Sequence, residues 1–247
     1  MPFALDSAYG FGLVLLRTAG LFLSAPILSA HTVPVRVRLS MALLVSLAVF
    51  TGAGSPRVVP PLELFPLAAA AARETAFGVL GGLAARWVLE AAAGAGQLAG
   101  LPMGIGFGAL VEPSSGIESS AIGELLLVLA QAVAVALGIH REAIAWLARS
   151  ARAFPPGGEL SLATLAARAI GEGTSSIALA IRLAFPVLAA VTLGNVAFGF
   201  LGRTAPQLNL SSIGFSVAVL SGGLALYLVA PDMADLAART AVAVFAG

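Results

Sequence analysis

The chain is organised around residues 94–123, which read GAGQLAGLPMGIGFGALVEPSSGIESSAIG and lie between two long apolar segments. Glycine recurs at every fourth position of this stretch, at Gly96, Gly100, Gly104 and Gly108. On a helix this spacing places the glycines on one face, where a neighbouring backbone can approach closely. Pro102 interrupts the pattern, so we expect a broken element rather than one straight helix.

The second part of this stretch is predicted to be a loop, because Glu112 and Pro113 are followed by a run of serines and glycines. A flexible, partly polar loop in a very apolar chain should be buried in protein or line a cavity, since lipid cannot satisfy its backbone. The sequence therefore predicts two helical halves around a Gly/Ser-rich loop. Residues 1–93 form the N-terminal helices, 94–123 the loop and 124–247 the C-terminal helical hairpins.

The amino-acid composition indicates an integral membrane protein, or a subunit almost wholly buried in an apolar assembly. Of the 247 residues, 59% are hydrophobic and only 10% are charged, whereas a typical soluble domain carries about 25% charged residues. The net charge of +1 gives no electrostatic footprint for nucleic acid. The chain has no cysteine, which excludes disulfides and thiolate metal sites.

Hydropathy predicts an all-α fold of about six apolar helical segments, some of them kinked or broken. We expect them near residues 8–28, 39–51, 64–93, 121–139, 160–201 and 210–229. The second is short for a bilayer crossing, which takes about 20 residues. An amphipathic continuation is expected over 140–152, a break at 154–158, a kink at Pro186 and a short amphipathic tail from Pro231. The arginine counts of alternate connections leave the orientation open.

Charged residues inside the apolar segments are candidates for ion pairs. Arg17 and Arg182 lie within such segments, where a charge is costly unless it is paired or near water; each faces either a pore or a neighbouring subunit. Segment 64–93 contains four more candidates, for which pairing within the chain is favoured over pairing between subunits: Arg73, Glu74, Arg86 and Glu90. Arg86 and Glu90 are four residues apart and can pair on one helix face.

No catalytic, cofactor-binding or metal site is predicted, and we expect the chain not to be an enzyme. The two histidines, His31 and His140, show no metal-ligand spacing. The glycines of 104–108 follow no predicted strand, so they do not fit a dinucleotide-binding loop. A stand-alone small-molecule transporter remains an alternative. Its only support is the acidic pair Glu74 and Glu90, and the chain shows no internal repeat.

Three separated stretches carry a family resemblance. Residues 17–39 contain SAPILS and VPVRVRL, residues 100–116 read GLPMGIGFGALVEPSSG, and residues 202–215 read GRTAPQLNLSSIGF. In order and approximate spacing they resemble the family of the flagellar biosynthetic protein FliR and its relative, the injectisome export-apparatus subunit SctT. One departure is Glu112, where the family pattern leads us to expect aspartate.

The resemblance implies a structural and gating subunit of a type III protein export gate in the bacterial inner membrane. Such a subunit joins FliP-like, FliQ-like and FlhB-like proteins around a closed helical pore, through which unfolded polypeptides leave the cytoplasm. Its fold resembles FliP-like and FliQ-like hairpins joined in one chain. The resemblance leaves open whether the system builds a flagellar basal body or a virulence injectisome.

The resemblance also implies a pore plug, which maps by position to Gly106, Phe107, Gly108, Leu110, Val111, Glu112, Pro113, Ser114, Ser115, Gly116 and Ile117. Glycine and serine would give this segment many accessible conformations, and its apolar side chains would seal a narrow lumen. An ordinary interhelical loop is the alternative.

A second candidate site is the polar turn that contains Arg203, Pro206, Gln207 and Asn209. Pro206 removes a backbone donor, and the two amide side chains can bond the carbonyls left unpaired. A shaped turn that docks on a FliP-like or FliQ-like neighbour and a simple polar turn both remain open.

Overall fold

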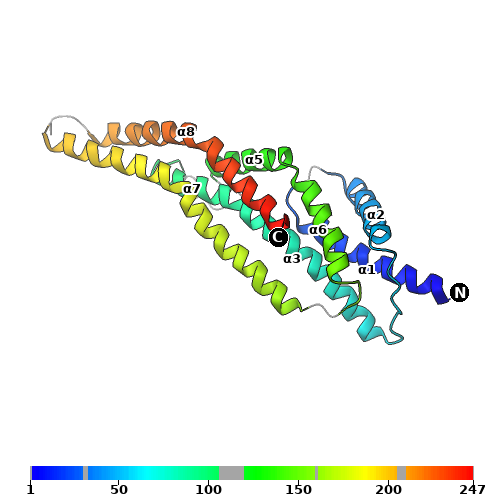
Figure 1. The fold of residues 1–247 in the computed structure, drawn as a ribbon. Coiled ribbons are helices and arrows are strands. Elements are labelled where there is room, and N and C mark those ends of the chain that lie inside the picture. The colour runs from blue at the N-terminus through cyan, green and yellow to red at the C-terminus, as the bar shows by residue number, and fades with distance from the viewer. Residues whose placement is uncertain (1, 30–32, 106–119, 159–160, 205–209, 247) are drawn as a thin grey trace. The chain divides into compact units, whose positions relative to one another are not determined.

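The computed structural model describes residues 2–29, 33–105, 120–158, 161–204 and 210–246, and all regular secondary structure in these ranges is helical (Figure 1). This confirms the predicted all-α fold for the described part of the chain. In chain order the helices are α1 (Pro2–Ser24), α2 (Val35–Gly52), α3 (Leu64–Gly100), α5 (Ala121–Ala136), α6 (Ile139–Ala153), α7 (Leu162–Thr204) and α8 (Leu210–Ala246).

Five of the described helices are long and apolar enough to cross a membrane. They are α1, α2, α3, α7 and α8, and the pair α5 and α6 would add a sixth span that is broken between the two helices. The number agrees with the predicted six apolar segments. A helix of 18 residues such as α2 rises about 27 Å, close to the thickness of the hydrocarbon core.

Contacts within the chain divide it into two compact units that are not consecutive in sequence. Unit 1 comprises Met1–Trp87, Val135–Gly173 and Ala241–Gly247, and unit 2 comprises Val88–Ala134 and Thr174–Thr240. Helices α3, α7 and α8 each contribute residues to both units.

Unit 1 is built on a close crossing of α1 and the first part of α3. A Cβ added at Gly20 would lie 2.4 Å from the carbonyl oxygen of Thr75, and one at Gly78 would lie 1.9 Å from the carbonyl oxygen of Arg17. Gly82, one turn further along α3, is equally close to Ser24. Small residues four apart let two helix backbones meet in this way. Helix α2 packs against both α1 and α6.

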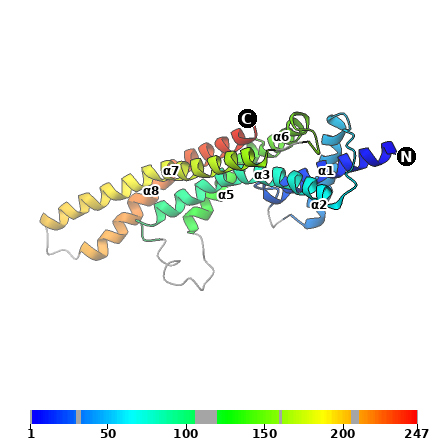
Figure 2. The ribbon, with the colours of Figure 1, turned by 90° about the horizontal axis from the view of Figure 1, so that it is seen from below.

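Unit 2 contains the C-terminal part of α3, most of α5 and the long antiparallel stretches of α7 and α8, which lie side by side in both views (Figures 1 and 2). Glycine again sets the helix spacing. A Cβ at Gly96 of α3 would lie 2.6 Å from the Cα of Gly123 in α5, and one at Gly194 of α7 would lie 3.0 Å from the hydroxyl of Ser221 in α8.

Two predicted boundaries are corrected by the structure. Residues 94–100 belong to α3 and not to the loop. Glycine has low helix propensity, but here Gly94 and Gly96 face Ala180 and Gly123, so tertiary packing stabilises the helix. The expected separate tail from Pro231 is instead the last part of α8, which continues through that proline to Ala246. The predicted break at 154–158 is confirmed, since α6 ends at Ala153.

The α1–α3 crossing predicts opposite effects for the same substitution at two glycines of unit 1. Gly78→Ala places a methyl group against the backbone of α1, so it should lower the free energy of unfolding by about 1–3 kcal/mol or more. Gly12→Ala lies on α1 with no atom within 4 Å of the added Cβ, so it should be neutral or stabilise the helix by up to about 1 kcal/mol. Unfolding of the detergent-solubilised protein in denaturant measures both. Equal effects of the two variants would contradict this packing.

Candidate functional site

The predicted plug residues lie outside the described part of the chain, and only the residues on either side of them can be placed. We call these flanking residues, Leu101–Ile105 and Ser120–Gly123, the loop base; all of them belong to unit 2. At its start, the N–H of Gly104 donates to the carbonyl oxygen of Leu101 at 3.0 Å, and the N–H of Ile105 donates to that of Gly100 at 3.2 Å. Gly104 has a φ of 76°, a conformation that suits glycine at the end of a helix.

Met103 anchors the loop base in the interior of unit 2. Its side chain is buried, and it lies against Gly222 of α8, which also faces Val191 of α7. A Cβ at Gly222 would be 2.6 Å from both Cγ and Sδ of Met103. The start of the predicted loop is therefore held by contact with α8, and this contact requires glycine at position 222.

The other side of the loop base lies next to the first. A Cβ at Gly100 would be 3.1 Å from the hydroxyl oxygen of Ser120, and Gly96 lies against Gly123 one turn into α5. The N–H of Glu124 donates to the carbonyl oxygen of Ser120 at 3.0 Å, which begins α5. The Ser120 hydroxyl is buried and has no hydrogen-bond partner among the described residues. The described residues before and after segment 106–119 therefore pack closely against each other.

The polar turn predicted as an assembly motif also falls largely outside the described residues. Helix α7 ends at Thr204 and α8 begins at Leu210, and residues 205–209 lie outside the described part of the chain. Pro206, Gln207, Asn209 and the side chain of Arg203 are outside the described part of the chain. Their proposed role in docking stays a prediction.

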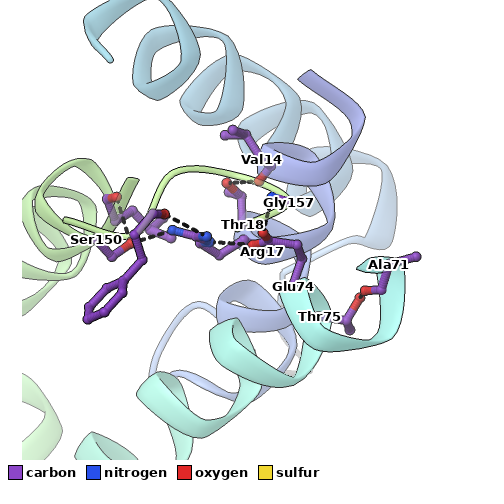
Figure 3. A network of polar contacts seen from close by, with 10 residues as sticks. Val14, Arg17, Thr18, Ala71, Glu74, Thr75, Ser150 and Gly157 are labelled. Carbon is purple, nitrogen blue, oxygen red and sulfur yellow. Dashed lines mark hydrogen bonds and ion pairs between the residues drawn. The ribbon is translucent and has the colours of Figure 1, made fainter. Parts of the chain in front are cut away.

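A buried ion pair lies at the centre of unit 1 (Figure 3). The Nε of Arg17 in α1 donates to Oε2 of Glu74 in α3 at 2.6 Å, and each side chain is only 1% exposed. The guanidinium carbon of Arg17 also lies 4.6 Å from the centre of the Phe77 ring. Two unit charges removed from water in this way depend on each other, because either charge left alone would be buried without compensation.

The same pair fastens the end of α6 and the turn that follows it. Arg17 Nη2 donates to the carbonyl oxygen of Phe154 at 3.1 Å, and Nη1 donates to the Ser150 hydroxyl at 3.4 Å. The second oxygen of Glu74, Oε1, accepts the N–H of Gly157 at 3.0 Å (Figure 3). One ion pair therefore joins α1, α3 and the α6–α7 connection. All three nitrogens of the Arg17 guanidinium and both carboxylate oxygens of Glu74 take part in its hydrogen bonds.

The structure assigns a partner to one of the four candidate ion-pair residues of segment 64–93. Glu74 bonds Arg17, a partner that the sequence analysis did not assign to it, whereas its neighbour Arg73 is exposed. Arg86 is exposed and Glu90 is half-buried, both make interactions, and their predicted pairing with each other stays a prediction. Arg17 was expected to face a pore or a neighbouring subunit, and the structure corrects this, because its charge is paired inside the chain with Glu74.

Comparison with known proteins assigns the chain to a family. A sequence model described as bacterial export proteins, family 1, matches residues 8–242, which include residues of every helix of both units. The chain belongs to this family. The resemblance to the FliR family that was predicted from three separated stretches is thereby confirmed.

Relatives that carry the name flagellar biosynthetic protein FliR match most of the chain. The protein of Escherichia coli strain K12 is 31% identical over 209 residues, which are 84% of this chain and 79% of that protein. The protein of Caulobacter vibrioides is 26% identical over 229 residues, 93% of this chain and 90% of the relative. That of Bacillus subtilis strain 168 is 25% identical over 221 residues, 87% and 83%.

The buried pair predicts a characteristic pattern of stabilities. Arg17→Met and Glu74→Gln each leave one uncompensated buried charge, and each should lower the free energy of unfolding by about 3–5 kcal/mol. The double variant leaves neither charge and keeps an acceptor for Gly157, so it should be more stable than either single variant.

Denaturant unfolding of the purified protein measures all three variants. Arg73→Met is the matched control, because it removes the exposed arginine beside Glu74 and should change stability little. If the single variants behave like this control, or if their effects simply add in the double variant, the pair does not hold unit 1 together.

Proposed function

We propose that the chain, a membrane component of the flagellar protein export apparatus, is a subunit that helps to form and seal the export channel. Membership of the family supports the export role. The loop base supports the sealing role, and it is the observation that carries the proposal. A segment that closes a channel must be held firmly at its ends, and here both ends leave from positions fixed by glycine-mediated packing.

In this proposal segment 106–119 is the plug of the channel, and Met103 is the fixed point from which it starts. Met103 is buried and lies against Gly222 of α8, and Gly222 in turn lies close to Val191 of α7. An unbranched thioether fills irregular space well, so the anchor can stay packed while the adjoining segment changes position. The sealing energy would come from apolar side chains of the segment, and the driving energy for export from partner proteins or the proton-motive force.

Exposed apolar faces of unit 2 support assembly with other subunits. Large apolar side chains are exposed along α7 and α8, among them Ile177, Ile181, Phe185, Leu193, Phe200, Phe215, Leu220, Leu224 and Leu228. Such faces are covered by lipid or by protein. Arg182 is exposed on the same stretch of α7, and a charge at this place is costly in lipid. We therefore propose that part of this surface meets neighbouring subunits or the aqueous channel.

The proposed neighbours are FliP-like, FliQ-like and FlhB-like proteins of the bacterial inner membrane, and the proposed cargo is unfolded polypeptide. The name of the matched relatives favours a flagellar system over an injectisome. In the flagellar case, loss of this chain would stop filament assembly because the subunits of the filament could not cross the membrane.

Sealing can be tested at two adjacent glycines of α8. In Gly222→Val the new side chain would overlap Met103 and Val191, which should shift the loop base and open a leak for ions and small solutes. Gly223→Val is the matched control, because no atom lies within 4 Å of its added Cβ. The measurement is ion or dye uptake by cells that express the complete export gate, with the amount of assembled complex determined in the same cells.

We expect Gly222→Val to leak and Gly223→Val to stay closed at equal amounts of complex. Equal permeability of the two variants, with normal assembly of both, would contradict the role of Met103 in the seal. Loss of assembly in Gly222→Val alone would assign this contact to subunit folding instead, and the milder Gly222→Ala would then distinguish the two roles.

A further inference from the structure

The connection between α2 and α3 carries the most exposed large apolar side chains in the described part of unit 1. Leu62 is 104% exposed, and Phe65, Leu64 and Val59 are 84%, 80% and 78% exposed. Elsewhere in the described part of unit 1 the highest value for such a side chain is 65%, at Leu44. All four residues lie within 59–65, which we call the apolar connector.

The chain that leads into the apolar connector is tied to the rest of unit 1. The N–H of Val58 donates to the carbonyl oxygen of Asp6 in α1 at 3.3 Å. A Cβ added at Gly10 of α1 would lie 2.4 Å from the carbonyl oxygen of Pro56, and one at Gly157 would lie 2.9 Å from Cγ1 of Val58. The connector therefore starts from a fixed position against α1 and the turn that follows α6.

The apolar connector itself is conformationally restricted. Pro60 and Pro61 have their φ angles fixed near about −65°, and a proline also restricts the residue before it. Directly afterwards α3 begins, because the N–H of Leu67 donates to the carbonyl oxygen of Glu63 at 3.4 Å. The backbone therefore loses little conformational entropy when the exposed side chains contact another surface.

The position of the apolar connector in the chain indicates which surface covers it. Helices α2 and α3 are each long and apolar enough to cross a membrane. When two successive helices both cross, the chain leaves the bilayer after the first and enters it again with the second. The connection 53–63 then lies at a membrane surface, and the nearest apolar phase for its exposed side chains is the bilayer that α3 enters.

The charged side chains near the apolar connector suit the same depth. Arg57 and Arg152 are exposed, and Nη2 of Arg152 donates to the carbonyl oxygen of Gly52, the last residue of α2, at 3.3 Å. Arginines at the end of a membrane-crossing helix lie at the level of the lipid phosphates, which a guanidinium binds well. Glu63, the one charge inside the connector, is exposed and precedes α3, where the helix N-terminus favours a negative charge.

We propose that the apolar connector is a membrane anchor that inserts into the boundary between the headgroups and the acyl chains of the bilayer. The inserting side chains are Val59, Leu62, Leu64 and Phe65. Glu74 follows Leu64 by ten residues, or about 15 Å of helix, so the anchor would also fix the depth of the buried ion pair in the membrane. This role goes beyond the proposed export function and does not depend on the seal.

Fluorescence quenching in lipid nanodiscs tests the proposal on the full chain, both alone and in the assembled export complex. The chain has no cysteine, so a single introduced cysteine is the only site for a thiol-reactive label. Val59→Cys and Leu62→Cys place the label in the apolar connector. Ser55→Cys is the matched control, because this exposed residue lies in the same connection but before the connector.

The label should report two environments within one connection. A phospholipid that carries a quencher near the top of its acyl chain should quench the label at 59 and 62 several-fold more strongly than at 55. Aqueous iodide should quench in the reverse order, because the inserted positions are shielded from water.

A second pair of variants separates insertion from mere closeness to the bilayer. In the Val59→Cys protein, Leu62→Glu adds a charge that is costly in an apolar layer, so lipid quenching at 59 should fall several-fold. Leu62 is fully exposed, so this substitution should leave the fold intact. Glu63→Gln is the matched control at the adjacent exposed residue, and it should leave the quenching unchanged.

Equal iodide quenching at positions 55, 59 and 62, without lipid quenching at 59 and 62, would overturn the proposal. Lipid quenching that is present in the isolated chain but disappears in the assembled export complex would also overturn it, since a protein partner would then cover the apolar connector. Both outcomes are independent of the sealing role, which the leak assay measures separately.

Discussion

The buried contact between Arg17 and Glu74 is the interaction on which unit 1 depends. The close crossing of α1 and α3 places Arg17 where water cannot reach it, and only a carboxylate on the facing helix makes that position tolerable. The pair then acts beyond the two helices, because its remaining donors and acceptor bind the end of α6 and the turn at Gly157. The cation also stacks on Phe77, whose ring packs against Trp146, so the ion pair and this aromatic contact are parts of one packed arrangement.

Glycine supplies the second constraint, and it serves the two units in different ways. In unit 1, Gly20 and Gly78 bring the backbones of α1 and α3 into close contact beside the ion pair. In unit 2, Gly96 and Gly222 bring α3, α5 and α8 against the loop base. These glycines have low helix propensity, which destabilises the helices, and the close tertiary packing that they allow offsets this loss.

Much of the fold followed from the sequence, because long apolar segments and Pro/Gly breaks are local signals. The break at 154–158 and the family itself were predicted correctly. Helix α3 continues past the end predicted near residue 93 to Gly100, because helix propensity carries no information on the close packing of Gly96 against Gly123. The partner of Glu74 was missed because Arg17 lies 57 residues away in sequence. The plug and the polar turn stay predictions outside the described residues.

Assembly is the direct test of the central claim that the chain is a channel-forming subunit of an export gate. The chain should be co-expressed with the FliP-like and FliQ-like proteins of its host, extracted in mild detergent and weighed by native mass spectrometry. We predict a stable mixed complex that contains this chain and both partners. Recovery of well-folded chain alone, while the FliP-like and FliQ-like proteins assemble without it, would contradict the account.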